Sequence, residues 1–213
     1  MLVWNGIQAC DVLCAVTGFP YGGITRWGLS GDLRCYTNHN EPVAENENGT
    51  ELICVYIHRP NTTLEPIAMR LAYLDCHAKY FIVRPTWVVE NGHDGTFLEV
   101  WRKECSEIWR SLEGEDYPEG NIIAFLFRTL GKFAPFLRKF SKRFVSYVKF
   151  HCTAGVFKGF MENLVFPWVP DTIARYSLYR LSPKSMEHSI RAGEWQFVYG
   201  NRELFNQVMN EAR

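Results

Sequence analysis

The sequence lacks the short motifs by which many nucleotide-binding and hydrolytic enzymes are recognised. It contains no GxxxxGK[ST] or GxGxxG loop, no HExxH helix, no GxSxG nucleophile turn and no CxxC pair. A phosphate-cradling loop, a zinc peptidase helix and a serine hydrolase elbow of the usual form are therefore excluded. Any chemistry must be carried by residues that the fold brings together from distant positions.

Long apolar runs are also missing. No window of 18 residues is apolar and uncharged, and the N-terminal run MLVWNGIQACDVLCAV has no basic start and contains Asp11. We therefore predict neither a transmembrane segment nor a signal peptide. The seven cysteines have no tight framework spacing, so we expect reduced thiols and a cytoplasmic or nuclear location.

The chain lacks a net charge, but its charged side chains are unevenly distributed along the sequence. The 213 residues carry no formal net charge, yet residues 121–168 hold eight basic side chains and one acid, Glu162. The remaining residues hold 15 basic and 22 acidic side chains, so a +7 segment stands against a −7 remainder. Such asymmetry indicates an interaction with an acidic surface.

A cationic amphipathic helix is predicted over about 136–150. Its phenylalanines recur at intervals of four, and its basic side chains fall on the other face. The same stripe could equally pack on the core and leave the basic face solvated. The predicted binding residues are Arg138, Lys139, Lys142, Arg143, Lys149, Phe140 and Phe144.

The first functional hypothesis is a non-enzymatic binding or regulatory protein that acts through this helix. An acidic protein surface is the first expected partner, and an anionic membrane surface or RNA are the others. The alternative is a cysteine-dependent hydrolase or transferase that uses Cys76 or Cys105. Partners for that thiol would be His93, His151 or His188, because a thiol needs a base that the fold brings to it.

A zinc site is a further hypothesis. Cys10 and Cys14 are separated by three residues, as are Cys35 and His39, and two such pairs resemble the way tetrahedral zinc is bound. Against zinc, Cys10 and Cys14 lie in an apolar run typical of buried free thiols. The sequence therefore predicts either no cofactor or zinc at Cys10, Cys14, Cys35 and His39.

The predicted fold is α+β, with a small mixed sheet in residues 1–112 and a mostly helical part over 121–213. The acidic segment 113–120 is the candidate boundary, although one continuous domain remains an alternative. Strands are expected at 51–58, 80–89 and 194–199. Helices are expected after Pro66, from Thr96, over 171–181, from Ser182 to Gly193 and after Asn201. The polar run 38–49 is expected to be a loop.

Overall fold

The chain is built around a single six-stranded antiparallel sheet in the computed structural model. The structure describes residues 2–16, 36–58, 60–90, 95–116, 152–178 and 181–210, with isolated positions at 127, 130, 131, 134–137 and 139. The sheet order is β4-β3-β2-β1-β5-β6. Its strands are β1 (Val12–Val16), β2 (His39–Glu45), β3 (Leu52–Ile57), β4 (Thr62–Pro66), β5 (Lys79–Pro85) and β6 (Trp195–Gly200).

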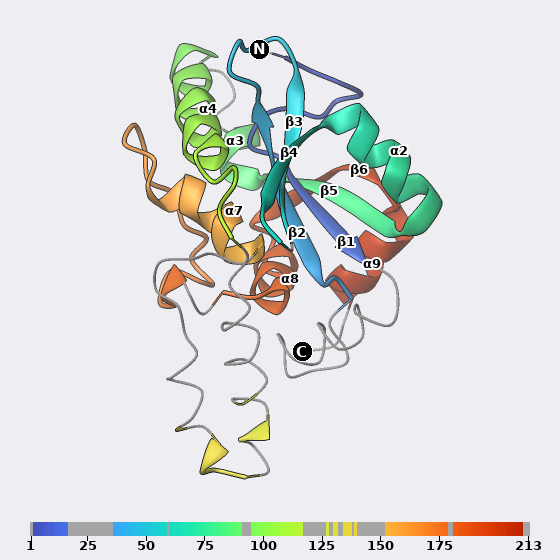
Figure 1. Cartoon of the computed structure of the whole chain (residues 1–213), viewed down its shortest axis with the longest axis vertical. Helices are drawn as coiled ribbons and strands as arrows, with labels where there is room; N and C mark the ends of the chain where they lie inside the picture. The colour runs from blue at the N-terminus through green and yellow to red at the C-terminus, as the bar shows by residue number, and fades with distance from the viewer. Residues whose placement is uncertain are drawn as a thin grey trace.

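Helices cover both faces of this sheet. They are α2 (Ile67–His77), α3 (Thr86–Glu90), α4 (Gly95–Arg110), α7 (Cys152–Met161), α8 (Pro183–Arg191) and α9 (Arg202–Asn210). Buried residues of α2 share one apolar cluster with Leu13, Val43 and Ile82 of the sheet. Those of α4, α7, α8 and α9 share the other cluster. Figure 1 shows α2 on one side of the strands and α4 with α7 on the opposite side.

Helix α7 lies unusually close to its neighbours because two of its residues are glycines. A Cβ atom on Gly159 would stand 2.2 Å from Nε1 of Trp109, and one on Gly155 would stand 2.1 Å from Cδ1 of Ile57. The indole N–H of Trp109 donates to the carbonyl oxygens of Gly155 (3.1 Å) and Val156 (3.0 Å). Because packed interiors tolerate no such overlap, glycine at these two positions lets α7 pack closely against both β3 and α4.

The predicted layout, with a small mixed sheet followed by a mostly helical part, is wrong. All strand pairs are antiparallel, and β6 from the C-terminal part pairs with β5 at the sheet edge. Helix α2 connects β4 at one edge to β5, and the three strands β3, β2 and β1 lie between them in the sheet. Sequence order alone therefore gave the wrong pairing.

Individual elements compare better with the sequence. Strand β3, helix α2 and helix α4 lie where the sequence predicted them, and α8 begins at Pro183 directly after Ser182, as expected. Residues 171–178 form turns instead of the predicted helix. The expected loop 38–49 contains β2, a central strand. Among the described residues, no helix has the length and apolar character needed to span a membrane.

Candidate functional site

Cys152 is the first residue of α7 and belongs to the larger apolar cluster. Its side chain is buried, with 1% of its surface exposed. A helix N-terminus carries unpaired backbone N–H groups and a partial positive charge, both of which favour a thiolate. Low-pKa cysteines are typically found in such positions, beside a basic side chain.

That basic side chain is His39, the first residue of β2. Burial alone would lower the pKa of the imidazole, but interactions with the Cys152 thiol and the Glu41 carboxylate together raise the pKa to about 9. A thiol and an imidazole in this relation can exchange a proton and form a thiolate–imidazolium pair. Cys152 and His39 are therefore a potential nucleophile and base.

The register between α7 and β2 is held by the neighbouring residues of the same pair. The Thr153 hydroxyl donates to Oδ1 of Asn40 at 2.8 Å, and Nδ2 of Asn40 donates to Sγ of Cys14 at 3.3 Å. Two consecutive residues of α7 thus bond to two consecutive residues of β2. Adjacent side chains of a strand point to opposite faces of the sheet, so one helix can contact both only at an end of the strand. The thiol therefore lies at the end of β2 where His39 is the first residue.

Glu41, two residues after the base, lies on the same face of β2. Its Oε1 is 3.2 Å from Nε2 of His39, an ion-pair separation outside regular hydrogen-bond geometry. Burial alone would raise the pKa of the Glu41 carboxyl, but His39 and Arg70 together hold it below its ordinary value. An ionised Glu41 stabilises the imidazolium and fixes the ring.

A second buried acid holds the chain just before His39. The Thr37 backbone N–H and hydroxyl both donate to Oε1 of Glu187 on α8, at 2.5 and 3.0 Å. Glu187 is fully buried, and Arg191 lies one helical turn away with its Nη1 3.9 Å from Oε2. The segment that delivers the base is therefore anchored from the face of the sheet opposite to Glu41.

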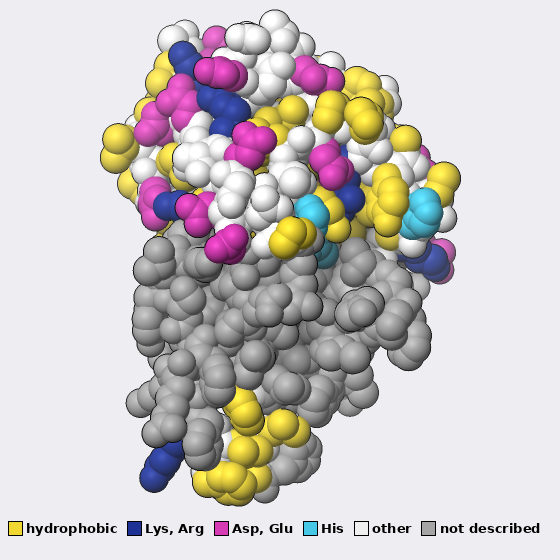
Figure 2. Space-filling view, viewed as in Figure 1, with side chains coloured by type: hydrophobic (Ala, Val, Ile, Leu, Met, Phe, Trp, Pro, Cys, Tyr) yellow, Lys and Arg dark blue, Asp and Glu magenta, His cyan; other side chains and the backbone are white. Residues whose placement is uncertain are grey.

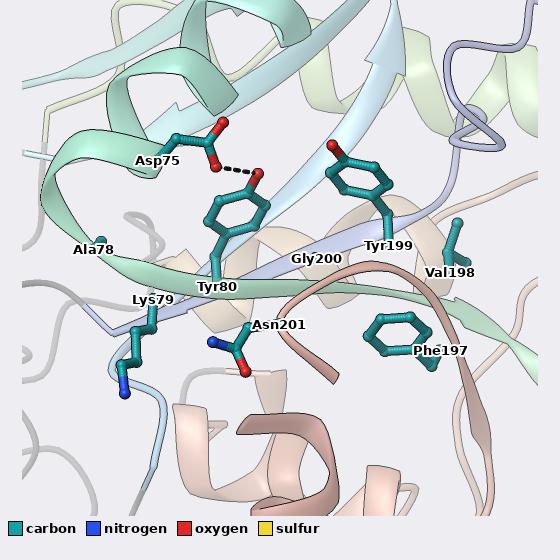
Figure 3. A pocket seen from close by; sticks show the side chains of 9 residues that line it. All are labelled: Asp75, Ala78, Lys79, Tyr80, Phe197, Val198, Tyr199, Gly200 and Asn201. Carbon is teal, nitrogen blue, oxygen red and sulfur yellow. Dashed lines mark hydrogen bonds between the residues drawn. The ribbon is translucent and has the colours of Figure 1, made fainter. Parts of the chain in front are cut away.

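A pocket of about 590 Å³ opens at the same end of the sheet. Tyr80 and His39 are both paired with Ala15, on opposite sides of β1, so they lie two strand spacings apart, roughly 10 Å. Figure 3 shows Tyr80 and Tyr199 side by side in the pocket, and the Tyr80 hydroxyl donates to Asp75 at 2.8 Å. Its described lining residues include no thiol or imidazole, so the pocket could hold a ligand but supplies no nucleophile.

The cysteines singled out from the sequence occupy different surroundings. Cys105 is buried on α4 and contacts the Cys10 thiol, the Gly159 carbonyl oxygen (3.5 Å) and the Asn163 amide (3.1 Å). Cys76 is exposed on α2. The proposed base His188 is exposed on α8, whereas His93 and His151 lie outside the described residues. Within the described residues, the thiol that interacts with a histidine is Cys152, next to His39.

The predicted zinc ligands are not gathered by the structure as far as it describes them. Cys10 contacts Cys105, Cys14 contacts Asn40, and His39 contacts Cys152 and Glu41. No group of three or more His, Cys, Asp or Glu side chains able to hold a metal occurs within the described ranges. The fourth predicted ligand, Cys35, lies outside them.

The predicted basic helix falls almost entirely on residues that the structure does not describe. Lys139 is described and exposed, while Arg138, Phe140, Lys142, Arg143, Phe144 and Lys149 lie outside the described residues. On the face shown in Figure 2, acidic and basic side chains of the described part are interspersed. Binding through this helix therefore stays a prediction.

Comparison with known proteins identifies the fold only. No family model matches the sequence, and no curated protein does. Among solved structures, the chain is similar to the metalloprotein yiiX (DUF1105) from Escherichia coli O157:H7, with a TM-score of 0.55 and 11% identity. The similarity covers 92% of this chain and 98% of the other. At this identity it shows a shared fold over nearly the whole length of both chains.

The description of that neighbour as a metalloprotein raises the question of a metal at the site. The donor set here does not suit a cation. Both carboxylate oxygens of Glu41 already accept hydrogen bonds from the Arg70 guanidinium, at 2.5 and 2.9 Å. A fixed positive charge beside the only carboxylate contacting His39 in the described part would repel a metal ion.

Proposed function

We propose that this protein is a cysteine-dependent acyl hydrolase or acyltransferase, with Cys152 as nucleophile and His39 as base. The observation that carries the proposal is the buried Cys152 thiol that interacts with the His39 imidazole, with Glu41 behind the ring. An ester, thioester or amide carbonyl is the electrophile such a pair attacks. The pair belongs to the class of the alternative sequence hypothesis, although it uses another cysteine.

The chemical step follows from the positions of these groups. The Cys152 thiol gives its proton to His39, and the thiolate attacks the carbonyl carbon to form a tetrahedral oxyanion. The oxyanion collapses to a thioester as the leaving group departs with the proton from His39. Water or another nucleophile then takes the acyl group and restores the thiol. Backbone N–H groups of the first turn of α7 would stabilise the oxyanion.

Burial of the thiol limits what can react. With 1% of Cys152 and 12% of the His39 side chain exposed, a bulky acyl donor reaches the sulfur only if the surrounding chain moves. A small donor is therefore the right probe. The pocket beside Tyr80, roughly 10 Å from the base, supports a substrate that extends along this end of the sheet.

The test is acylation by p-nitrophenyl acetate, followed by release of p-nitrophenolate and by peptide mass spectrometry. We expect a stoichiometric burst and an acetyl group on Cys152. The burst should be lost in Cys152→Ser and kept in the matched controls Cys76→Ser and Cys105→Ser. A burst that survives in Cys152→Ser, or acetylation of Cys76 without Cys152, would overturn the proposal.

A further inference from the structure

Arg70 is the side chain that connects α2 to the site, although it does not contact the thiol. It is 3% exposed and forms a two-point pair with Glu41, from Nε to Oε2 at 2.9 Å and from Nη2 to Oε1 at 2.5 Å. A planar guanidinium held by two parallel bonds fixes the orientation of a carboxylate as well as its charge. The direction in which Glu41 faces His39 is therefore set by Arg70.

The same guanidinium supports a second neighbour of the base. The Arg70 Cζ atom lies 3.6 Å from the centre of the Tyr56 ring. Tyr56 in turn meets His39 edge to face, with 5.3 Å between ring centres. Both groups that contact the imidazole on this side of the sheet, Glu41 and Tyr56, are thus in direct contact with Arg70.

The charge of Arg70 is constant, whereas that of His39 alternates during acyl transfer. When His39 is protonated, Glu41 has two cationic neighbours; when His39 has given its proton to the leaving group, Arg70 is the remaining one in direct contact. A carboxylate that is fully buried without a cation takes up a proton instead. We propose that Arg70 is a positioning residue that keeps Glu41 ionised and aimed at His39 through both halves of the reaction.

Other ionisable groups near Glu41 do not supply this charge. Glu65 is the second acid within reach of Arg70, at 3.8 Å from Nη1, and it is partly exposed. Burial raises the pKa values of the Cys54, Cys14 and Tyr56 side chains, so these three stay neutral near neutral pH.

This inference rests on the proposed function, and a four-variant comparison separates the two. The variants are Arg70→Met, Arg70→Lys, Glu41→Gln and the double variant Glu41→Gln/Arg70→Met. The measurement is the rate of Cys152 alkylation by iodoacetamide from pH 5 to 9, resolved by peptide mass spectrometry, alongside the acetylation burst. A purely structural role would change stability without shifting the pH profile.

We expect Arg70→Met to raise the midpoint of the profile by about one pH unit, which is roughly a tenfold slower reaction below the midpoint. Arg70→Lys, which keeps the charge, should recover part of that loss. In the Glu41→Gln background the Arg70 substitution should have no further effect. The double variant removes both buried charges and is expected to fold even if the single Arg70→Met variant does not.

Two results would overturn the inference while leaving the proposed function intact. One is an Arg70→Met profile identical to that of the wild type. The other is an equal shift on adding Arg70→Met to Glu41→Gln, because Arg70 would then act by a route other than Glu41. If the wild-type protein shows no acetyl group on Cys152, the proposed function itself fails.

Discussion

Two buried cysteine contacts, Cys10 with Cys105 and Cys152 with His39, differ in what surrounds the sulfur. Cys10 contacts Cys105, and burial raises the pKa of Cys10 far above its ordinary value. Cys152 is equally buried but contacts His39, an imidazole with Glu41 and Arg70 behind it. Burial alone makes a thiol inert, whereas a charged neighbour reverses that effect. The neighbour, and not the exposure, distinguishes the two sites.

The largest effect is expected when that neighbour is removed. In His39→Ala, alkylation of Cys152 by iodoacetamide at pH 7 should fall about 10²-fold or more, because the thiol loses its proton acceptor. The reactivity of Cys105 should not change. His188→Ala is the matched control, since His188 is an exposed histidine on α8. Equal rates of Cys152 alkylation in His39→Ala and His188→Ala would show that His39 does not activate Cys152. The Cys152 and Cys10 sites would then not differ in this way.

The sequence missed this site because its base lies on a strand that reads as a loop. The run NHNEPVAENENG is polar and rich in turn residues, yet β2 lies between β1 and β3 with its first polar residues buried. His39, Asn40 and Glu41 tolerate burial because each bonds to a partner distant in sequence. Those partners are Cys152, Thr153 and Arg70, and a pattern within the segment itself cannot predict them.

Individual helices and strands that bury a continuous apolar face were predicted more accurately than the site. Apolar periodicity located α2 and α4, and β-branched composition located β3, because each buries a continuous face. The sequence around the thiol does contain a local pattern. Cys152 begins an apolar run of small residues that forms α7, with glycines at 155 and 159. Strand pairing was inaccessible, since the order of six strands depends on contacts between distant segments.

A medium effect is expected in the pH dependence of stability. The pKa of His39 is about 9 in the folded protein and about 6.5 in an unfolded chain. A raised pKa stabilises the folded state fully below pH 6.5, and this contribution is lost as the pH rises towards 9. The difference in free energy of unfolding between the wild type and His39→Gln should therefore shrink by about 3 kcal/mol over that interval.

Urea unfolding at pH 6, 7.5 and 9 measures this difference. Cys10→Ala serves as the control, because its difference from the wild type should stay constant between pH 6 and 7.5, where neither the folded nor the unfolded thiol ionises. A His39→Gln difference that is independent of pH would show that His39 is not held in its charged form. The two cysteine environments would then be electrostatically alike.

The smallest effect is expected in the second pair. Cys105→Ala removes a sulfur atom from the contact with Cys10 and leaves a small cavity beside α7, at a cost of about 1 kcal/mol in stability. The Asn163 amide keeps its other bond, to the Trp101 carbonyl oxygen at 2.9 Å, so the loss is limited. The acetylation burst at Cys152 should stay within twofold of the wild type, on the order of the scatter of such measurements. If Cys105→Ala instead abolishes the burst as Cys152→Ser is expected to do, both thiols belong to one reactive system and the contrast between the pairs is false.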